Sequence, residues 1–225
     1  EPVATGVTPG SGPGHLALFG YPPSEYFIGR GVLSALGVGF ELEPGDVAAR
    51  GNFCTVDEDG TVTDRRAGRI STEKNEELCD ILSGIELDGA RAFVQPVKEH
   101  RFLLVLRGDG LGADVEDTDP HETGRMPVDP EPGDRTSART SELLKSFLKQ
   151  AREKLADHSP ANMVLLRGFA SLPDWPSMEA AYGISGVAVA AYPMYKGVSR
   201  LLGMAVYDAE SNMRSKIDLV REHWN

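Results

Sequence analysis

A serine in a turn built from glycine and proline is the first feature of this chain that could do chemistry. Ser11 lies between Gly10 and Gly12, and Pro13 follows directly before a short apolar segment. Proline suits the first turn of a helix, where its missing N–H costs no hydrogen bond. A phosphate carried by Ser11 would then face unpaired N–H groups at the positive end of that helix. The residues alone leave two interpretations open: a nucleophile for phosphoryl transfer, or a serine that only caps the helix.

Arginines near expected strand ends are candidate ligands for an anion. Three of them lie within the six residues 64–69, and Arg107 and Arg167 each follow an apolar run and precede a glycine. Guanidinium groups bind carboxylate and phosphate oxygens in pairs. Ligands of open α/β sheets collect at the carboxyl ends of strands, so Arg107 and Arg167 are expected to face one crevice. The candidate substrate-binding residues are Arg66, Arg69, Arg107, Arg167 and Lys196.

Each of these candidates also has a structural interpretation that the sequence leaves open. The segment 64–69 could be a solvated charged turn, in which Asp64 pairs with Arg65 or Arg66. Arg107 and Arg167 could form structural ion pairs, and Lys196 could be a surface lysine.

The segment 109–137 is rich in Asp, Pro, Gly and Thr, which predicts a long loop. Its carboxylates at 114, 116, 117 and 119 lack the spacing of a calcium-binding loop, so we expect them to be solvated. The five histidines are widely spread and form no paired metal-ligand motif.

Hydrophobic periodicity predicts strands that alternate with helices, and therefore an α/β fold. Expected strands cover residues 47–56, 61–63, 102–106, 163–166, 184–191 and 204–206. Expected helices cover 72–82, 138–157, 195–202 and 210–224, the first of them capped by Ser71 or Thr72.

Composition limits the classes of partner. The 225 residues have a net charge of −11, which argues against nucleic acid and anionic membranes. No apolar run approaches membrane-spanning length. Cys54 and Cys79 are too few for a disulfide framework, so we expect buried thiols in a reducing compartment, the cytoplasm. Because residue 1 is Glu, we expect an internal piece of a longer protein.

Taken together, these motifs resemble one family, the archaeal-type 2,3-bisphosphoglycerate-independent phosphoglycerate mutases of the alkaline phosphatase superfamily. The similar segments follow one another in the family order, and one departure is Pro22, where the family usually has Asp. They are Thr-Pro-Gly-Ser-Gly-Pro-Gly-His at 8–15 with its continuation to 21, and residues 26–33, 64–70, 117–120, 161–168 and 190–198.

The resemblance implies an isomerase, an intramolecular phosphotransferase that interconverts 3-phosphoglycerate and 2-phosphoglycerate. Ser11 would take the phosphate as phosphoserine and return it to the other hydroxyl of bound glycerate. Two divalent metal ions, typically manganese, would activate Ser11, with the remaining metal ligands outside this chain. The fragment would then be inert as a mutase when isolated.

The family also implies a domain organisation, in which an inserted α/β substrate domain is flanked by remnants of an alkaline-phosphatase-like domain. Residues 1–24 would carry the nucleophile, 25–208 would form the inserted domain, and 209–225 would be a returning helix. The partner would be a small-molecule phosphoglycerate, and the sequence does not give the oligomeric state.

Two rival functions remain open on the sequence. One is a related phosphotransferase, similar to a homoserine kinase, and the other is a non-catalytic anion-binding domain. The arginine supply favours a doubly anionic substrate over zwitterionic homoserine.

Overall fold

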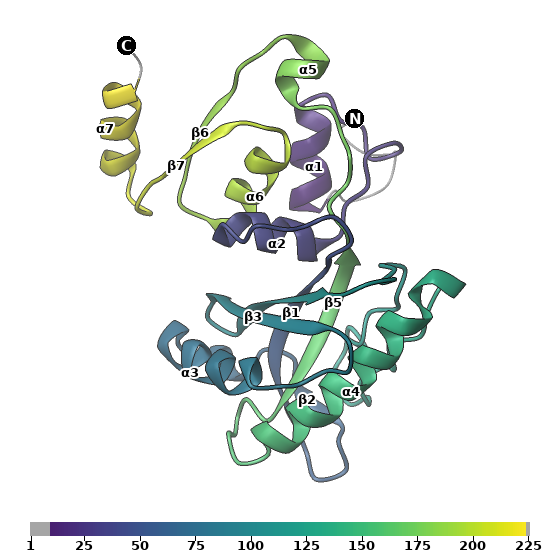
Figure 1. Ribbon diagram of the computed structural model, residues 1–225. Coiled ribbons are helices and arrows are strands. Elements are labelled where there is room, and N and C mark those ends of the chain that lie inside the picture. The colour runs from purple at the N-terminus through teal and green to yellow at the C-terminus, as the bar shows by residue number, and fades with distance from the viewer. Residues whose placement is uncertain (1–9, 224–225) are drawn as a thin grey trace. The chain divides into compact units, whose positions relative to one another are not determined.

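The computed structural model describes residues 10–223, and their contacts divide them into two compact units (Figure 1). Unit 2 contains residues 29–32 and 42–172, and unit 1 contains the described residues 10–28, 33–41 and 173–223. Residues 173–208, which the resemblance groups with the inserted domain, pack in this division with unit 1.

The centre of unit 2 is a five-stranded sheet in which every pairing is antiparallel. Strand β1 (Val47–Val56) lies between β4 (Arg101–Arg107) and β5 (Met163–Ala170). Strand β3 (Arg91–Lys98) pairs with β4, and β2 (Val62–Asp64) pairs with the last residues of β1. Since β4 and β5 both oppose β1, they run in the same direction and their carboxyl ends lie at the same edge.

Two helices, α3 (Thr72–Ser83) and α4 (Ala138–Leu155), cover one face of this sheet (Figure 1). Helix α4 presents an apolar stripe at helical spacing, and Leu144, Phe147, Ala151 and Leu155 in it are fully buried. They share one core with apolar residues from β1, β4 and β5. Helix α3 begins after Ser71, whose hydroxyl accepts a hydrogen bond from the backbone N–H of Lys74.

The mixed α/β class is confirmed, and so are most of the expected elements. Strand β3 was not predicted, because Pro96 interrupts its apolar pattern; a proline is tolerated there because β3 is an edge strand. The strand predicted over 184–191 is wrong in length. Strand β6 (Val187–Ala190) has four residues, and Val187 is 62% exposed. Cys54 and Cys79 are both buried free thiols, as expected.

Unit 1 combines short helices with a parallel pair of strands, β6 and β7 (Ala205–Asp208). Helices α1 and α6 are in contact, because the ring of His15 lies 5.0 Å from that of Tyr195. A glycine lets α6 approach α2 closely: a Cβ on Gly197 would lie 2.1 Å from the Leu33 carbonyl oxygen. The helices of this unit are α1 (Ser11–Leu18), most of α2 (Arg30–Val38), α5 (Met178–Tyr182), α6 (Pro193–Leu201) and α7 (Met213–His223).

Short 3₁₀ turns lie at Ala67–Arg69 (η1) and Arg135–Ser137 (η2) in unit 2. Within residues 10–223, no helix combines the length and apolar character that crossing a membrane requires.

Candidate functional site

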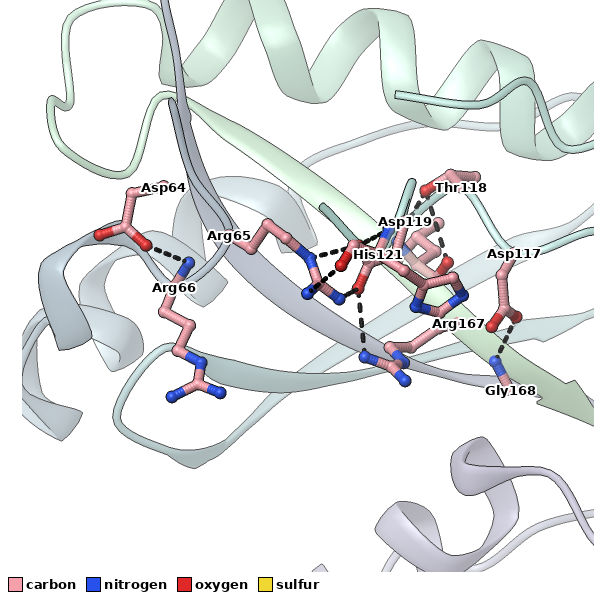
Figure 2. A network of polar contacts seen from close by, with 10 residues as sticks. Asp64, Arg65, Arg66, Asp117, Thr118, Asp119, His121, Arg167 and Gly168 are labelled. Atoms are coloured by element: carbon pink, nitrogen blue, oxygen red, sulfur yellow. Dashed lines mark hydrogen bonds and ion pairs between the residues drawn. The ribbon is translucent and has the colours of Figure 1, made fainter. Parts of the chain in front are cut away.

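A buried carboxylate joins two arginines at the end of β5 (Figure 2). The side chain of Asp119 is 0% exposed and accepts hydrogen bonds from Arg65 Nε at 2.8 Å and Nη2 at 2.7 Å. It also accepts one from Arg167 Nη1 at 3.1 Å and one from the backbone N–H of His121 at 3.0 Å. The expectation of a solvated acidic loop is therefore wrong for Asp119.

These contacts keep Asp119 ionised. Burial alone would raise the pKa of its carboxyl group, because a charge is poorly solvated in the interior. The hydrogen bonds from Arg65 and the His121 backbone, with the charges of Arg65 and Arg167, outweigh burial and place the pKa below its usual value. At neutral pH the group is therefore a buried anion shared by two guanidinium groups.

Each residue of the segment 117–119 makes contact with the C-terminal half of β5. The backbone N–H of Thr118 donates to the Leu166 carbonyl, and its hydroxyl accepts from the Leu166 N–H, both at 2.8 Å. The Asp117 carboxylate accepts from the Gly168 N–H at 2.6 Å (Figure 2). With the Asp119–Arg167 contact, each of the three consecutive loop residues binds one of the three strand residues 166–168.

Gly168 lets the backbone of Arg30 approach this strand end. Its φ is +65°, a conformation that side chains disfavour, and a Cβ there would lie 2.6 Å from the Arg30 backbone nitrogen. The close approach places the charge of Arg30 near Arg167. Burial, then the charge of Arg30, lowers the pKa of the Arg167 guanidinium despite the nearby carboxylates of Asp119 and Asp117.

The sheet adds further polar side chains to the face opposite α3 and α4. Arg50 lies directly opposite Arg167 in the β1–β5 pair, and Asn52 lies opposite Arg101 in the β1–β4 pair. Successive side chains of a strand point to opposite faces of the sheet. Phe53 packs in the core beneath α3 and α4, so Arg50 and Asn52 point to the other face. Like charges directly opposite on neighbouring strands destabilise a sheet, and a bound anion would relieve that repulsion. We call Arg30, Arg50, Asn52, Arg101 and Arg167 the arginine face.

Several buried polar atoms of the arginine face lack a hydrogen-bond partner among the described residues. They are Nε of Arg101, Nε of Arg167 and Oδ1 of Asn52. Each unpaired buried group of this kind costs about 1–3 kcal/mol, so native proteins rarely keep one without a reason. Two buried guanidinium donors without acceptors indicate an anionic ligand.

His100 lies buried in the hairpin turn before Arg101 and stays neutral at pH 7. Burial lowers its pKa to about 4, and the charges of Arg101, Arg66 and Arg50 act in the same direction against Glu99. Asn75 of α3 fixes this turn, because its amide donates to the carbonyls of Glu99 and Arg101 at 2.5 and 2.7 Å.

The arginines expected in the segment 64–69 fall into two groups. Arg65 pairs with Asp119, whereas Arg66 and Arg69 are exposed. Asp64 accepts a hydrogen bond from the backbone N–H of Arg66 at 2.8 Å (Figure 2), and one from the backbone N–H of Gly68 at 2.7 Å. Asp64 thus shapes the turn through the backbone instead of pairing with a guanidinium group.

Arg107 has its own carboxylate partners, away from Asp119. Its Nε and Nη2 donate to the two oxygens of Asp46 at 2.8 and 2.7 Å, and Nη1 contacts Glu43. Asp46 is buried, and the Arg107 guanidinium also lies 4.9 Å from the Phe93 ring centre. The strands do end at one edge, but Arg107 and Arg167 bind different carboxylates, which favours the structural ion pair for Arg107.

Ser11 and Lys196 both lie in unit 1. Ser11 is the exposed first residue of α1; Gly10 takes the cap position, where no side-chain hydrogen bond is made. The capping alternative for Ser11 is therefore not what the structure shows. The Ser11 carbonyl oxygen lies 2.6 Å from Nδ1 of His15. Lys196 Nζ lies 2.8 Å from Asp208 Oδ1, which occupies the lysine with a neighbouring carboxylate.

The described residues do not provide a metal site. In residues 10–223, no group of three or more His, Cys, Asp or Glu side chains is arranged to hold a metal ion. The two divalent ions that the resemblance implies do not fit any set of side chains in this part of the chain. We therefore derive no chemical step through a metal.

Reasoning from the sequence missed Arg50, Asn52 and Arg101 as site residues. The signal was present in β1, where Arg50 and Asn52 stand two residues apart inside an otherwise apolar segment. Polar residues at this spacing share one face of a strand, and a polar residue on a buried strand indicates a ligand or an ion pair.

These contacts define a mixed α/β chain whose larger unit presents an arginine-rich polar face, the type of surface that binds carboxylates and phosphates. A family model described as 2,3-bisphosphoglycerate-independent phosphoglycerate mutase matches residues 1–162. The chain belongs to this family, and the resemblance seen in the sequence is confirmed.

Named relatives agree with this assignment. A probable 2,3-bisphosphoglycerate-independent phosphoglycerate mutase from Thermus thermophilus is 45% identical over 99% of this chain and 56% of its own length. One from Deinococcus radiodurans is 45% identical over 100% of this chain and 57% of its own length. The solved cofactor-independent phosphoglycerate mutase from Thermoplasma acidophilum is 37% identical, with a TM-score of 0.70 over 96% of this chain and 61% of that one. The chain thus spans little more than half the length of the curated relatives.

Proposed function

We propose that this chain is part of a phosphoglycerate mutase that interconverts 3-phosphoglycerate and 2-phosphoglycerate without 2,3-bisphosphoglycerate. The proposal rests on the family and on one observation, the buried and unpaired guanidinium donors of the arginine face. Phosphoglycerate carries a phosphate and a carboxylate, and both have the oxygen geometry that guanidinium groups bind.

The charge distribution supports an anionic substrate for the arginine face. The whole chain has a net charge of −11, which repels a polyanion at long range. Arg30, Arg50, Arg101 and Arg167 bring positive charge to this face, where Asp119 pairs with Arg167 and Glu99 with Arg101. A phosphate or carboxylate placed among them would satisfy the unpaired Nε atoms of Arg101 and Arg167.

Some residues expected from the sequence keep a place in this proposal. Arg167 belongs to it as a substrate ligand, and the exposed Arg66 and Arg69 remain candidates, as does Lys196. Arg107 is placed outside it, because Asp46 and Glu43 already occupy its guanidinium group.

In the proposed reaction Ser11 is the nucleophile. Its position as the exposed first residue of α1 leaves its side chain at the helix N-terminus, where unpaired N–H groups favour a phosphoryl group. Ser11 would form phosphoserine, the arginines would retain glycerate, and the phosphate would return to the other hydroxyl. The family implies divalent ions, for which we propose manganese held by ligands outside this chain, and we propose a cytoplasmic location.

We also propose the domain assignment that the family implies. Residues 1–24 and 209–225 would belong to a phosphatase-like domain, and the insertion between them would contain unit 2 with its arginine face.

The test uses the full-length product of the gene that contains this chain, supplied with Mn²⁺. We expect ³¹P NMR to show 3-phosphoglycerate converting to 2-phosphoglycerate without added 2,3-bisphosphoglycerate. The Ser11→Ala variant should lose this activity by at least about 10³-fold, because the covalent intermediate can no longer form. A parallel sample receives ATP and homoserine.

Two results would contradict the proposal in different ways. Phosphohomoserine as the product would keep the phosphotransferase and overturn the substrate. Mutase activity that survives Ser11→Ala would overturn the nucleophile, whereas turnover of neither substrate would favour a non-catalytic anion-binding domain.

A further inference from the structure

The two arginines that share Asp119 use their hydrogen-bond donors differently. Arg65 directs all three nitrogens at protein acceptors: Nε and Nη2 at Asp119 and Nη1 at the His121 carbonyl, the last at 2.7 Å. Arg167 contacts Asp119 through Nη1, while its buried Nε has no partner among the described residues. Arg65 is therefore committed to the network, and Arg167 keeps a donor for a ligand (Figure 2).

Asp119 is unsuited to contact an anionic substrate itself. Its side chain is 0% exposed, and it already accepts four hydrogen bonds from Arg65, Arg167 and the His121 backbone. Its negative charge would also repel a phosphate or carboxylate. Asp119 instead binds Nη1 of Arg167. Because the guanidinium is planar, fixing one nitrogen helps to set the directions of the other two.

The positive charge around Arg167 favours a nearby carboxylate that fixes its side chain. Arg50 lies directly opposite in the neighbouring strand, and the charge of Arg30 acts on the same guanidinium group. Without a counter-charge, the Arg167 guanidinium would be repelled by the charge of Arg30. Asp119 supplies that counter-charge at Nη1, and Thr118 and Asp117 hold the loop against Leu166 and Gly168.

We infer that Asp119 is a positioning residue of the proposed anion site: braced by Arg65, it orients Arg167 so that the free Nε faces the substrate. The inference rests on the proposed function, since it needs an anion that binds Arg167. It assigns a role to the acidic loop 117–119 that its composition did not suggest.

The competing explanation is that Asp119 only stabilises the fold, and a second ion pair in unit 2 provides the matched control. Asp46 is also buried and binds Arg107 through two nitrogens at 2.8 and 2.7 Å, the same distances as in the Asp119–Arg65 pair. Asp46→Asn therefore removes an equivalent ion pair at a place where we propose no ligand.

The experiment uses this 225-residue chain with the variants Asp119→Asn, Arg65→Lys and Asp46→Asn. The probe is 3-phosphoglycerate, titrated while the arginine Nε–Hε signals are followed by ¹H–¹⁵N NMR. The Arg167 signal is assigned by its loss in Arg167→Lys. Urea unfolding of each variant measures the loss of stability separately.

We expect Asp119→Asn to broaden the Arg167 signal and weaken 3-phosphoglycerate binding about tenfold, as for one lost charge-assisted hydrogen bond. Arg65→Lys keeps the charge but loses the two parallel hydrogen bonds, so it should weaken binding in the same direction by about threefold, even if Asp119→Asn fails to fold. Asp46→Asn should lose comparable stability and bind 3-phosphoglycerate like the unaltered chain.

The possible failures are distinguishable. If the unaltered chain binds 3-phosphoglycerate and Arg65→Lys or a folded Asp119→Asn binds it equally well, the positioning role is overturned and the anion site stands. Equal weakening in Asp46→Asn would also overturn it, because the effect would then follow stability alone. If the unaltered chain shows no shift of the Arg167 signal with 3-phosphoglycerate, the proposed site fails and the inference fails with it.

Discussion

His100 is a titratable residue that unit 2 holds in its neutral form. It is 1% exposed, and burial together with Arg101, Arg66 and Arg50 lowers its pKa to about 4. A neutral imidazole beside several arginines avoids adding a further positive charge to the arginine face. The same environment makes the free energy of unfolding depend on pH.

The dependence has a defined sign. Between about pH 4 and the unfolded pKa of about 6.5, the unfolded chain binds a proton at His100 that the folded chain does not. Stability from this residue is therefore complete above about pH 6.5 and is lost as the pH falls towards 4. We expect the free energy of unfolding to drop by about 1–2 kcal/mol between pH 7 and pH 5 through His100. Urea titrations at both pH values measure it.

A His100→Gln variant removes this titration and provides the comparison. Its loss of stability between pH 7 and pH 5 should be smaller than that of the unaltered chain. An equal loss in both proteins would show that carboxylates account for the whole effect.

At the scale of elements, local sequence patterns predicted the helices and strands, which depend mainly on residues near one another in the chain. The strand 47–56 matches β1, and the expected helix 138–157 matches α4 to within two residues, because apolar spacing encodes both. The Asp119–Arg65 contact could not be found in this way, since the two residues are 54 positions apart. Composition alone presented Asp119 as one more acid of a polar loop.

Local sequence patterns also could not separate the roles of the two strand arginines. Arg107 and Arg167 follow similar apolar strands and precede glycine, yet one is held by Asp46 and the other is shared with Asp119. Only the folded positions of residues 46 and 119 separate these roles. The order of strands, in which β1 separates β4 from β5, is likewise set by long-range pairing.

The end of β5 yields a prediction about Gly168. Replacement by Ala puts a side chain at a φ of +65° and a Cβ 2.6 Å from the Arg30 backbone, so both strain and overlap oppose it. We expect Gly168→Ala to lower the free energy of unfolding by more than about 2 kcal/mol, measured by urea denaturation.

A Gly110→Ala variant separates the destabilising effect of backbone strain from that of steric overlap. Its φ is +67°, but a Cβ there would meet nothing within 4 Å, so Gly110→Ala should cost only the backbone strain of about 1–2 kcal/mol. If the two variants lost equal stability, the close approach of Arg30 to Gly168 would carry no energetic weight.

For the whole molecule, an acidic chain places Arg50, Arg101 and Arg167 on one face of the sheet of unit 2. In the proposed function, a bound anion would offset the charge of Arg30 that acts on Arg167. Binding to the folded state alone stabilises a protein in proportion to the logarithm of ligand concentration. Ligand-dependent stability is therefore a property by which the arginine face can be recognised.

We expect 3-phosphoglycerate at about 100 times its dissociation constant to raise the Tm of the unfolding transition by about 5–10 °C. Arg167→Leu should abolish most of this rise, because it removes a guanidinium group that we assign to the ligand. Arg125→Leu is the control: this arginine is 68% exposed and pairs only with Glu122 three residues away among the contacts described. An equal rise in all three proteins, measured calorimetrically, would contradict a specific site at Arg167.

The antiparallel placement of β1 between β4 and β5 has a consequence for synthesis on the ribosome. Arg50 emerges before Arg101, and β5 with Arg167 only after the loop that contains Asp119. Until β5 is made, one edge of β1 has no partner, and the Asp119 carboxylate has no Arg167 to bind. A nascent chain therefore has an open sheet edge along β1 until β5 has been made, a state in which association with other chains competes with folding.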